Sequence, residues 1–219
     1  MSCTKHVLIA VVCGLVGAGT ATAGERLSLS DFASGSLAGW ETRGFDDVAP
    51  SRYDLVDLEQ HTVLRGRCDN SASVIGLERE VDLEETPVLN WSWRVEKVFP
   101  GIDERSKSGD DFAARVYAVI DGGLLKWRTR AVNYVWAGSE PAGSAWPNPF
   151  RDEAMMVAVR SGADKAGQWV TQSRNVKADF KRFYDKDTDH IDGIALMTDC
   201  DNHGGAATAY FRDIYFSAQ

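Results

Sequence analysis

The chain has 219 residues, and 24 Lys and Arg stand against 32 Asp and Glu, which gives a formal net charge of −8 at pH 7. This charge disfavours nucleic acid and anionic lipid as partners, because both are bound by cationic groups that neutralise phosphate. Hydrophobic residues make up 44% of the chain, enough for a sizeable core, and no linker, repeat or charge block divides the sequence.

The first residues have the layout of a secretory signal peptide. Lys5 precedes an apolar run from Val7 to Val16, and small residues follow as far as Ala23. We expect cleavage after Ala23, which leaves residues 24–219 as one domain with a formal charge of −9, since the removed segment holds one Lys and no acid. The apolar run is far shorter than the roughly 20 residues that span a bilayer. We therefore expect a periplasmic or extracellular protein that does not span the membrane.

Alternation of apolar and polar residues with a period of two dominates the rest of the chain and predicts about ten β-strands. Trp91 and Trp93 share the apolar face of one such segment, so we expect both in the core. The predicted strands are Arg52–Leu58, Thr62–Arg67, Ser73–Glu80, Val88–Val95, Phe112–Ile120, Lys126–Trp136, Ala154–Arg160, Gln168–Arg174, Ile191–Thr198 and Thr208–Phe216.

One segment, Val176–Tyr184, has helical periodicity, and Asn175 is placed to cap its first turn. One short helix among many strands predicts an all-β sandwich or barrel. The segment Ala137–Asp152 contains three of the six prolines, which predicts a long surface loop of the kind that often contacts ligands. Trp136 and Trp146 border this loop and are candidates for exposed rings on which a ligand can stack.

Several motifs in fixed order resemble the family called domain of unknown function 3047. They are SGDDFAARVYAVI (108–120), NYVWA (133–137), VRSG (159–162), Trp169 followed by SRNVKADF (169–180), and IDGIALMTDCDN (191–202). The resemblance covers most of the chain, from near Phe32 to Phe216. It implies a secreted bacterial protein with an antiparallel β-sandwich of the jelly-roll, galactose-binding-like type, a fold widely used for carbohydrate binding. It implies no established activity.

Cys68 and Cys200 are the two cysteines that remain after removal of the signal segment. An even number of cysteines in an oxidising compartment predicts a disulfide between them. Two separate buried thiols are the alternative. The family pattern leads us to expect Thr at position 200, so a disulfide there is specific to this chain.

Asp110 and Asp111 precede Arg115 and Tyr117 at the start of one predicted strand. Alternation places Asp111, Arg115 and Tyr117 on one face. A carboxylate and a guanidinium can hydrogen-bond vicinal hydroxyl groups while an aromatic ring covers the apolar face of a sugar, so this face is a candidate glycan site. The alternative is a structural salt bridge between Asp111 and Arg115.

Asp199, Asp201 and Asn202 cluster at the end of another predicted strand and offer the hard oxygen ligands that calcium prefers. Asp and Asn are also ordinary turn residues, so a structural calcium ion and a plain turn both stay open. The aspartates of segment 185–189 imitate an EF-hand loop but lack its glycine and its bidentate glutamate, which indicates a solvated turn. No nucleotide, flavin, haem or zinc motif is present, so no other cofactor is implied.

Three functions fit these patterns. The first is non-catalytic binding of carbohydrate or cell-envelope glycan. The second is an enzyme that acts on polysaccharide, and the third is a structural or protein-partner role in the envelope. A glycosidase would pair Asp111 with Asp199 or Asp201, and a lyase would draw its base from Tyr117, Tyr134 or His203 and use Arg115 to neutralise a uronate.

Overall fold

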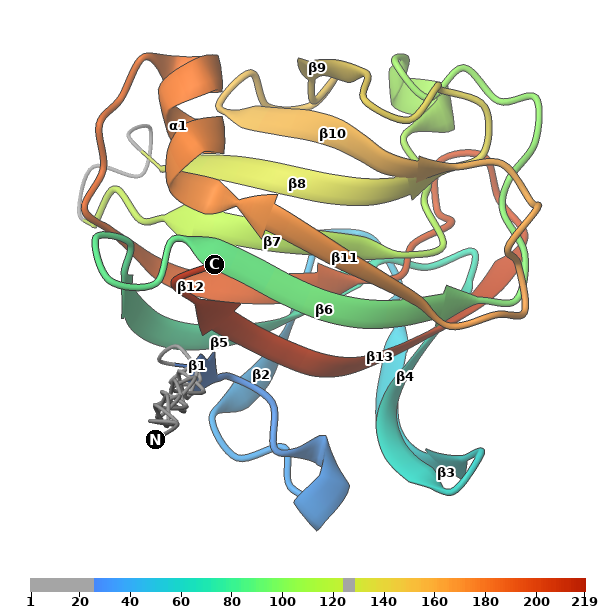
Figure 1. Ribbon diagram of the computed structural model, residues 1–219. Coiled ribbons are helices and arrows are strands. Elements are labelled where there is room, and N and C mark those ends of the chain that lie inside the picture. Colours follow the sequence, from blue (N-terminus) through green and yellow to red (C-terminus); the bar gives the residue numbers. More distant parts are fainter. Residues whose placement is uncertain (1–25, 124–128) are drawn as a thin grey trace, which may run out of the picture.

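Two β-sheets face each other and form a sandwich in the computed structural model, which describes residues 26–123 and 129–219 (Figure 1). The predicted signal peptide lies outside the described residues. The predicted all-β sandwich with one helix is confirmed, and helix α1 (Val176–Tyr184) lies beside strands of both sheets. Between residues 26 and 219, with the gap at 124–128, no helix has the length and apolar character needed to cross a membrane.

The first sheet contains β1 (Arg26–Ser28), β3 (Arg52–Leu58), β4 (His61–Asp69), β6 (Val88–Val95), β11 (Val170–Asn175) and β13 (Ala206–Ser217). The second sheet contains β2 (Trp40–Gly44), β5 (Ser73–Asp82), β7 (Arg115–Ile120), β8 (Arg130–Ala137), β9 (Ala145–Pro147), β10 (Ala154–Ser161) and β12 (His190–Met197). Two short 3-10 helices lie at Phe32–Ser34 and Lys107–Gly109.

The first sheet has the order β11-β6-β13-β4-β3, with β1 paired to β13, and the second has the order β2-β5-β12-β7-β8-β10-β9. Pairing among the described strands is antiparallel except between β8 and β10, which run parallel. The predicted antiparallel sandwich therefore contains one parallel pair of strands. Segment 138–153 joins β8 to β10 and exceeds the roughly twelve residues that a parallel crossover requires.

Two predicted segments need smaller corrections. The segment predicted as a surface loop, Ala137–Asp152, contains β9, which pairs with β10 at the edge of the second sheet. Pro147 is tolerated there because an edge strand leaves one side of its backbone without a hydrogen-bonding neighbour. The strand predicted to start at Phe112 starts at Arg115, and the residues before it form a turn-rich connection.

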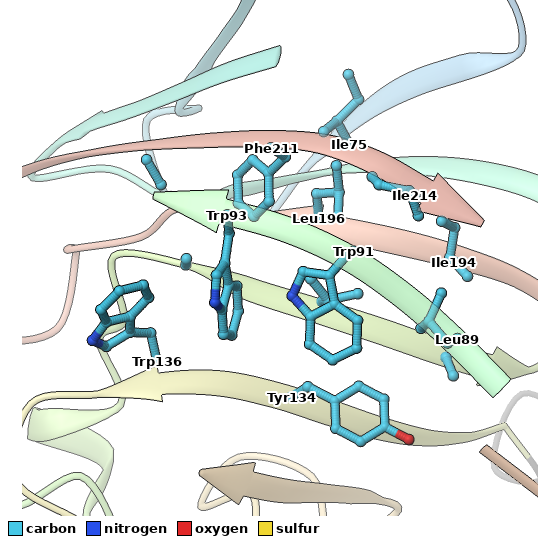
Figure 2. Close-up of a cluster of buried hydrophobic side chains, with 14 of the residues drawn as sticks. Ile75, Leu89, Trp91, Trp93, Tyr134, Trp136, Ile194, Leu196, Phe211 and Ile214 are labelled. Atoms are coloured by element: carbon cyan, nitrogen blue, oxygen red, sulfur yellow. The ribbon is translucent and has the colours of Figure 1, made fainter. Parts of the chain in front are cut away.

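Aromatic rings from both sheets meet in the core (Figure 2). Trp91 and Trp93 on β6 are fully buried, as predicted. The ring centroid of Trp91 lies 5.4 Å from that of Tyr134, and the centroid of Trp93 lies 5.7 Å from that of Trp136. The predicted exposure of Trp136 is therefore wrong: its ring is 1% exposed, and its Nε1 donates to the carbonyl of Gly162 at 3.0 Å.

The helix cap and the disulfide are both confirmed. The Asn175 side chain accepts a hydrogen bond from the Ala178 N–H at 2.9 Å. Cys68 on β4 is bonded to Cys200, which follows β12, with the two Cα atoms 5.9 Å apart. The disulfide therefore joins the first sheet to the segment that follows a strand of the second.

Candidate functional site

The face of the second sheet that points away from the core carries a cavity of about 460 Å³. Because side chains alternate along a strand, the residues next to the core positions point to this face. Arg115 and Tyr117 on β7, Asn133 on β8, Val74 on β5 and Met197 on β12 line the cavity. Its volume lies in the range of small-molecule sites, about 300–1,000 Å³.

A second apolar cluster covers the part of this face beside the cavity. It contains Phe112, Val135, Ala137, Trp146, Met156 and Ala158. Trp146 is 3% exposed, and its ring centroid lies 6.4 Å from that of Phe112. The prediction that Trp146 is an exposed stacking ring is therefore wrong, because β9 pairs with β10 and its central side chain is buried in this cluster.

Arg115 is buried at the floor of the cavity and holds two carboxylates. Its Nε donates to Asp199 Oδ1 at 2.7 Å, and its Nη2 donates to Asp199 Oδ2 and to the Asp110 carbonyl. Its Nη1 donates to Asp110 Oδ1 at 3.3 Å, and Asp110 Oδ2 accepts from Asn148 Nδ2 at 2.9 Å. The predicted alternative of an Asp111–Arg115 salt bridge is corrected: the partners of Arg115 are Asp110 and Asp199.

Asp111 instead holds the turn that follows β12. Its Oδ1 accepts from the backbone N–H of Asn202 at 3.1 Å and from Asn202 Nδ2 at 3.2 Å, and its Oδ2 accepts from the backbone N–H of His203 at 2.5 Å. Asp111 is buried and does not line the cavity, whereas Asp110 does. Asp111 therefore positions Asp201 and Asn202, which border the cavity.

Burial dominates the electrostatics of the floor. It raises the pKa of Asp199 to about 8, although Arg115 counteracts the rise. Burial also raises the pKa of Asp110 and of Asp201 above their ordinary values. Burial disfavours the charged form of Arg115, but Asp110 and Asp199 outweigh this effect and hold its pKa above the ordinary value. One guanidinium is therefore surrounded by an excess of carboxyl groups.

Carboxylate oxygens of Asp111, Asp199 and Asp201 lie within 4.8 Å of one another, the spacing of a metal site. Asn202, one of the predicted calcium ligands, directs its amide Nδ2 toward Asp111, so a donor faces the cluster. The oxygens of Asp111 and Asp199 already accept hydrogen bonds from backbone N–H groups and from Arg115. These donors do not fit a calcium ion among the three carboxylates, and calcium binding stays a prediction.

Two phenylalanines flank the cavity and were missed in the sequence. Phe45 and Phe150 are 48% and 52% exposed, the large exposed hydrophobic residues of the described chain, and both line the cavity. Phe45 directly follows the edge strand β2. Phe150 lies between β9 and β10 toward the other edge, in a turn where Asn148 Oδ1 accepts from the Phe150 N–H at 3.0 Å. The two rings therefore border the cavity from opposite sides.

The candidate bases of a lyase do not gather at this site. Tyr134 is buried in the core, donates to Asp179 Oδ2 at 2.8 Å, and has a pKa that burial raises. His203 is exposed and is not among the residues that line the cavity. Tyr117 lines the cavity, but burial raises its pKa and its hydroxyl donates to Met197 Sδ at 3.2 Å.

Three solved structures are among those to which this chain is similar. A carbohydrate binding module of family 29 matches 89% of this chain and 92% of its own, with 12% identity and a TM-score of 0.43. A thermo-stable cellulase derived from a Rhodothermus marinus cellulase matches 87% and 96%, with 9% identity and a TM-score of 0.47. The xyloglucanase domain of NopAA from Sinorhizobium fredii matches 84% and 100%, with 12% identity and a TM-score of 0.41.

No curated protein matches the chain. The model of the family described as Protein of unknown function (DUF3047) matches residues 38–215. The match spans both sheets, the helix and the residues of the cavity, and the chain therefore belongs to the DUF3047 family.

Proposed function

We propose that the protein binds carbohydrate at the cavity of the second sheet without catalysing a reaction. The observation that supports this most is the pair of exposed rings, Phe45 and Phe150, on opposite sides of a polar floor. Sugars combine an apolar C–H face with hydroxyl groups, so a site for them needs rings to stack on and polar groups fixed in place. Hydrogen bonds hold the polar groups of the floor in place. Arg115 donates to Asp110 and to Asp199, and Asn148 donates to Asp110.

The carboxyl groups support binding better than hydrolysis. A glycosidase needs two accessible carboxyl groups, roughly 5 to 10 Å apart. Asp110, Asp111 and Asp199 are buried, and their oxygens accept hydrogen bonds from side chains or backbone N–H groups. Asp201 is only partly buried, and Asp46 is the exposed carboxylate that also lines the cavity. Hydrolysis would therefore rest on Asp201 and Asp46.

We also propose that the protein acts in the periplasm or outside the cell. The Cys68–Cys200 disulfide is typical of proteins from oxidising compartments. Residues 1–23 have the layout of a signal peptide. N-terminal sequencing of the protein from a cell fraction tests this: a mature chain that starts at Gly24 supports it, and a cytosolic chain that retains residues 1–23 contradicts it.

A glycan array followed by calorimetry tests the proposed function. We expect the protein expressed from the full-length sequence to bind at least one glycan, and Phe45→Ala and Phe150→Ala each to weaken that binding about tenfold, which corresponds to about 1.4 kcal/mol. Trp169→Ala is the control, because Trp169 packs on Arg212 of β13 on the other sheet. No binding to any glycan, or equal losses in the control, would refute the proposal.

The same samples separate binding from catalysis. We expect no new reducing ends or unsaturated products after prolonged incubation with the bound glycan. Product formation that is lost in Asp201→Asn or Asp46→Asn would replace the binding proposal with the hydrolase.

A further inference from the structure

The hydrogen-bond donors at the floor of the cavity are already used within the protein. Four of the five N–H groups of Arg115 donate to Asp110 or Asp199. Asn148 Nδ2 donates to Asp110 Oδ2, and Asn202 Nδ2 donates to Asp111 Oδ1. A ligand therefore finds few donors at the floor.

Acceptors, in contrast, are left over. Asn133 is 1% exposed and lines the cavity, and its Oδ1 accepts no hydrogen bond from residues 26–123 or 129–219. Its Nδ2 donates to Met156 Sδ at 3.2 Å, so the free atom is the acceptor. Asp201 is partly exposed at the same cavity, and its Oδ1 accepts a long hydrogen bond of 3.3 Å from Asn202 Nδ2. A buried acceptor without a partner destabilises the protein, and a ligand that donates a hydrogen bond to it would remove this cost.

The charge of the residues that line the cavity also favours a ligand that donates hydrogen bonds. Its acidic members are Asp46, Asp110, Asp199 and Asp201, and its basic members are Arg115 and Arg151. With every carboxyl group ionised the formal charge of the lining is −2, and the raised pKa of Asp199 reduces this excess at neutral pH; the cation at the floor is already paired with Asp110 and Asp199. Arg151 is exposed at the rim of the cavity, so the excess of carboxyl groups concerns the floor, where a negative group on a ligand would lie against Asp199 and Asp201.

We propose that the cavity selects glycans by their donors and charge: it binds most tightly a glycan with a free amine against Asp201, less tightly an uncharged glycan, and least tightly a glycan with carboxylate or sulfate groups. This inference rests on the proposed function. An ammonium group supplies donors and positive charge together, whereas a carboxylate supplies acceptors alone. Asn133 would take a hydroxyl or amine hydrogen from the same ligand.

A calorimetric comparison of matched glycans tests the proposal. The probes are hexasaccharides of glucose, glucosamine and glucuronate, and of galactose, galactosamine and galacturonate, titrated at low salt. We expect the amine form to bind at least tenfold more tightly than the uncharged form with the same sugar configuration, and the acidic form to bind more weakly than the uncharged form. Acidic glycans that bind as well as uncharged ones, or amine forms no tighter than uncharged ones, would overturn the inference while the proposed function stands. No binding of any probe or array glycan would instead refute the proposed function.

A single substitution tests whether Asp201 causes the preference for amine-bearing glycans. Asp201→Asn keeps the size of the side chain and removes its charge, and we expect it to abolish the amine preference, measured as the ratio of the affinities for the amine and uncharged glycans. Asp164→Asn removes the same charge at an exposed site outside the cavity lining, and we expect it to leave the preference intact. An amine preference that survives in Asp201→Asn, or falls equally in both variants, would contradict the role of Asp201.

Discussion

The aromatic rings between the two sheets and the rings at the cavity differ in how the backbone holds them. Trp91 and Trp93 alternate along the middle of a strand and meet rings of the opposite sheet, so both are fully buried. Phe45 and Phe150 lie in connections beyond the ends of strands, where no facing layer covers them, and about half of each is exposed. Position relative to the strand, and not the size of the ring, decides which aromatic residues remain available to a ligand.

The largest expected effect separates these two groups by stability. We expect Trp93→Ala to lower the free energy of unfolding by about 3–5 kcal/mol, because it removes a buried ring from the core. Phe150→Ala should change it by less than about 0.5 kcal/mol, because the ring is exposed. Urea unfolding of both variants measures the difference. A loss above 2 kcal/mol in Phe150→Ala would mean that the ring supports the fold.

The buried arginine can be compared in the same way with an exposed one. Arg115→Met leaves Asp110 and Asp199 buried without their cation, which should cost about 3–5 kcal/mol of unfolding free energy. Arg105 pairs with Glu140 at the surface, so Arg105→Met should cost about 0–1 kcal/mol. Equal losses in urea unfolding would contradict the view that Arg115 holds the floor together.

The disulfide should affect both the stability of the core and the geometry of the cavity. Cys200 lies between Asp199 and Asp201, and its partner Cys68 is on the other sheet. We expect the double variant Cys68→Ser, Cys200→Ser to lose about 2–5 kcal/mol of unfolding free energy. Glycan affinity should also fall, even at a temperature at which the variant is folded. Unchanged affinity in a folded, less stable variant would show that the site does not depend on this link.

A pH series distinguishes the polar floor from the apolar core. Burial raises the pKa of Asp199 from 3.8 to about 8, so the folded state holds a proton that the unfolded state has lost between these values. The free energy of unfolding should therefore fall as the pH rises from 5 to 8. The His190 pKa is raised by Asp189 and acts in the same direction. Urea unfolding at four pH values should give a flatter slope for Asp199→Asn, and a stability that rises with pH would contradict this account.

The smallest expected effect concerns calcium. Arg115 and backbone N–H groups already donate hydrogen bonds to the carboxylates of Asp111 and Asp199. Addition of 1 mM CaCl₂ or EDTA should therefore leave the melting temperature unchanged within about 1 °C. A bound ion at a hundred times its Kd would add about 2.7 kcal/mol. This corresponds to roughly 5–10 °C for a chain of this size. A rise of that order, lost in Asp201→Asn, would establish the predicted calcium site.

Much of the fold could be predicted because period-two alternation marks strands with one face in the core, as in β6 and β12. The short strands β1, β2 and β9 were not predicted, because three to five residues give too little alternation to detect. The parallel pairing of β8 and β10 was not predicted, because it depends on the path of the connecting segment.

The site could be predicted only in part. Arg115, Tyr117, Asp199 and Asp201 were found because strand positions and acidic turns are visible in sequence, and all four line the cavity. The partners of Arg115 were mistaken because alternation was extended back to Asp111, although the strand begins at Arg115.

The exposed rings were missed because turns and not periodicity place them. The Asn148–Pro149–Phe150 run, with an Asn that can hold a turn, was the one signal that pointed to Phe150. A search for aromatic residues beside turn-forming Asn or Gly would have found Phe150 and also Phe45, which follows Gly44.

A crystal structure of the protein with its best array glycan would test the central claim most directly. Sugar density between Phe45 and Phe150, over Arg115 and Asn133, is the predicted result. Density on the outer face of the first sheet, near Trp169, with the cavity of the second sheet free of sugar, would contradict it.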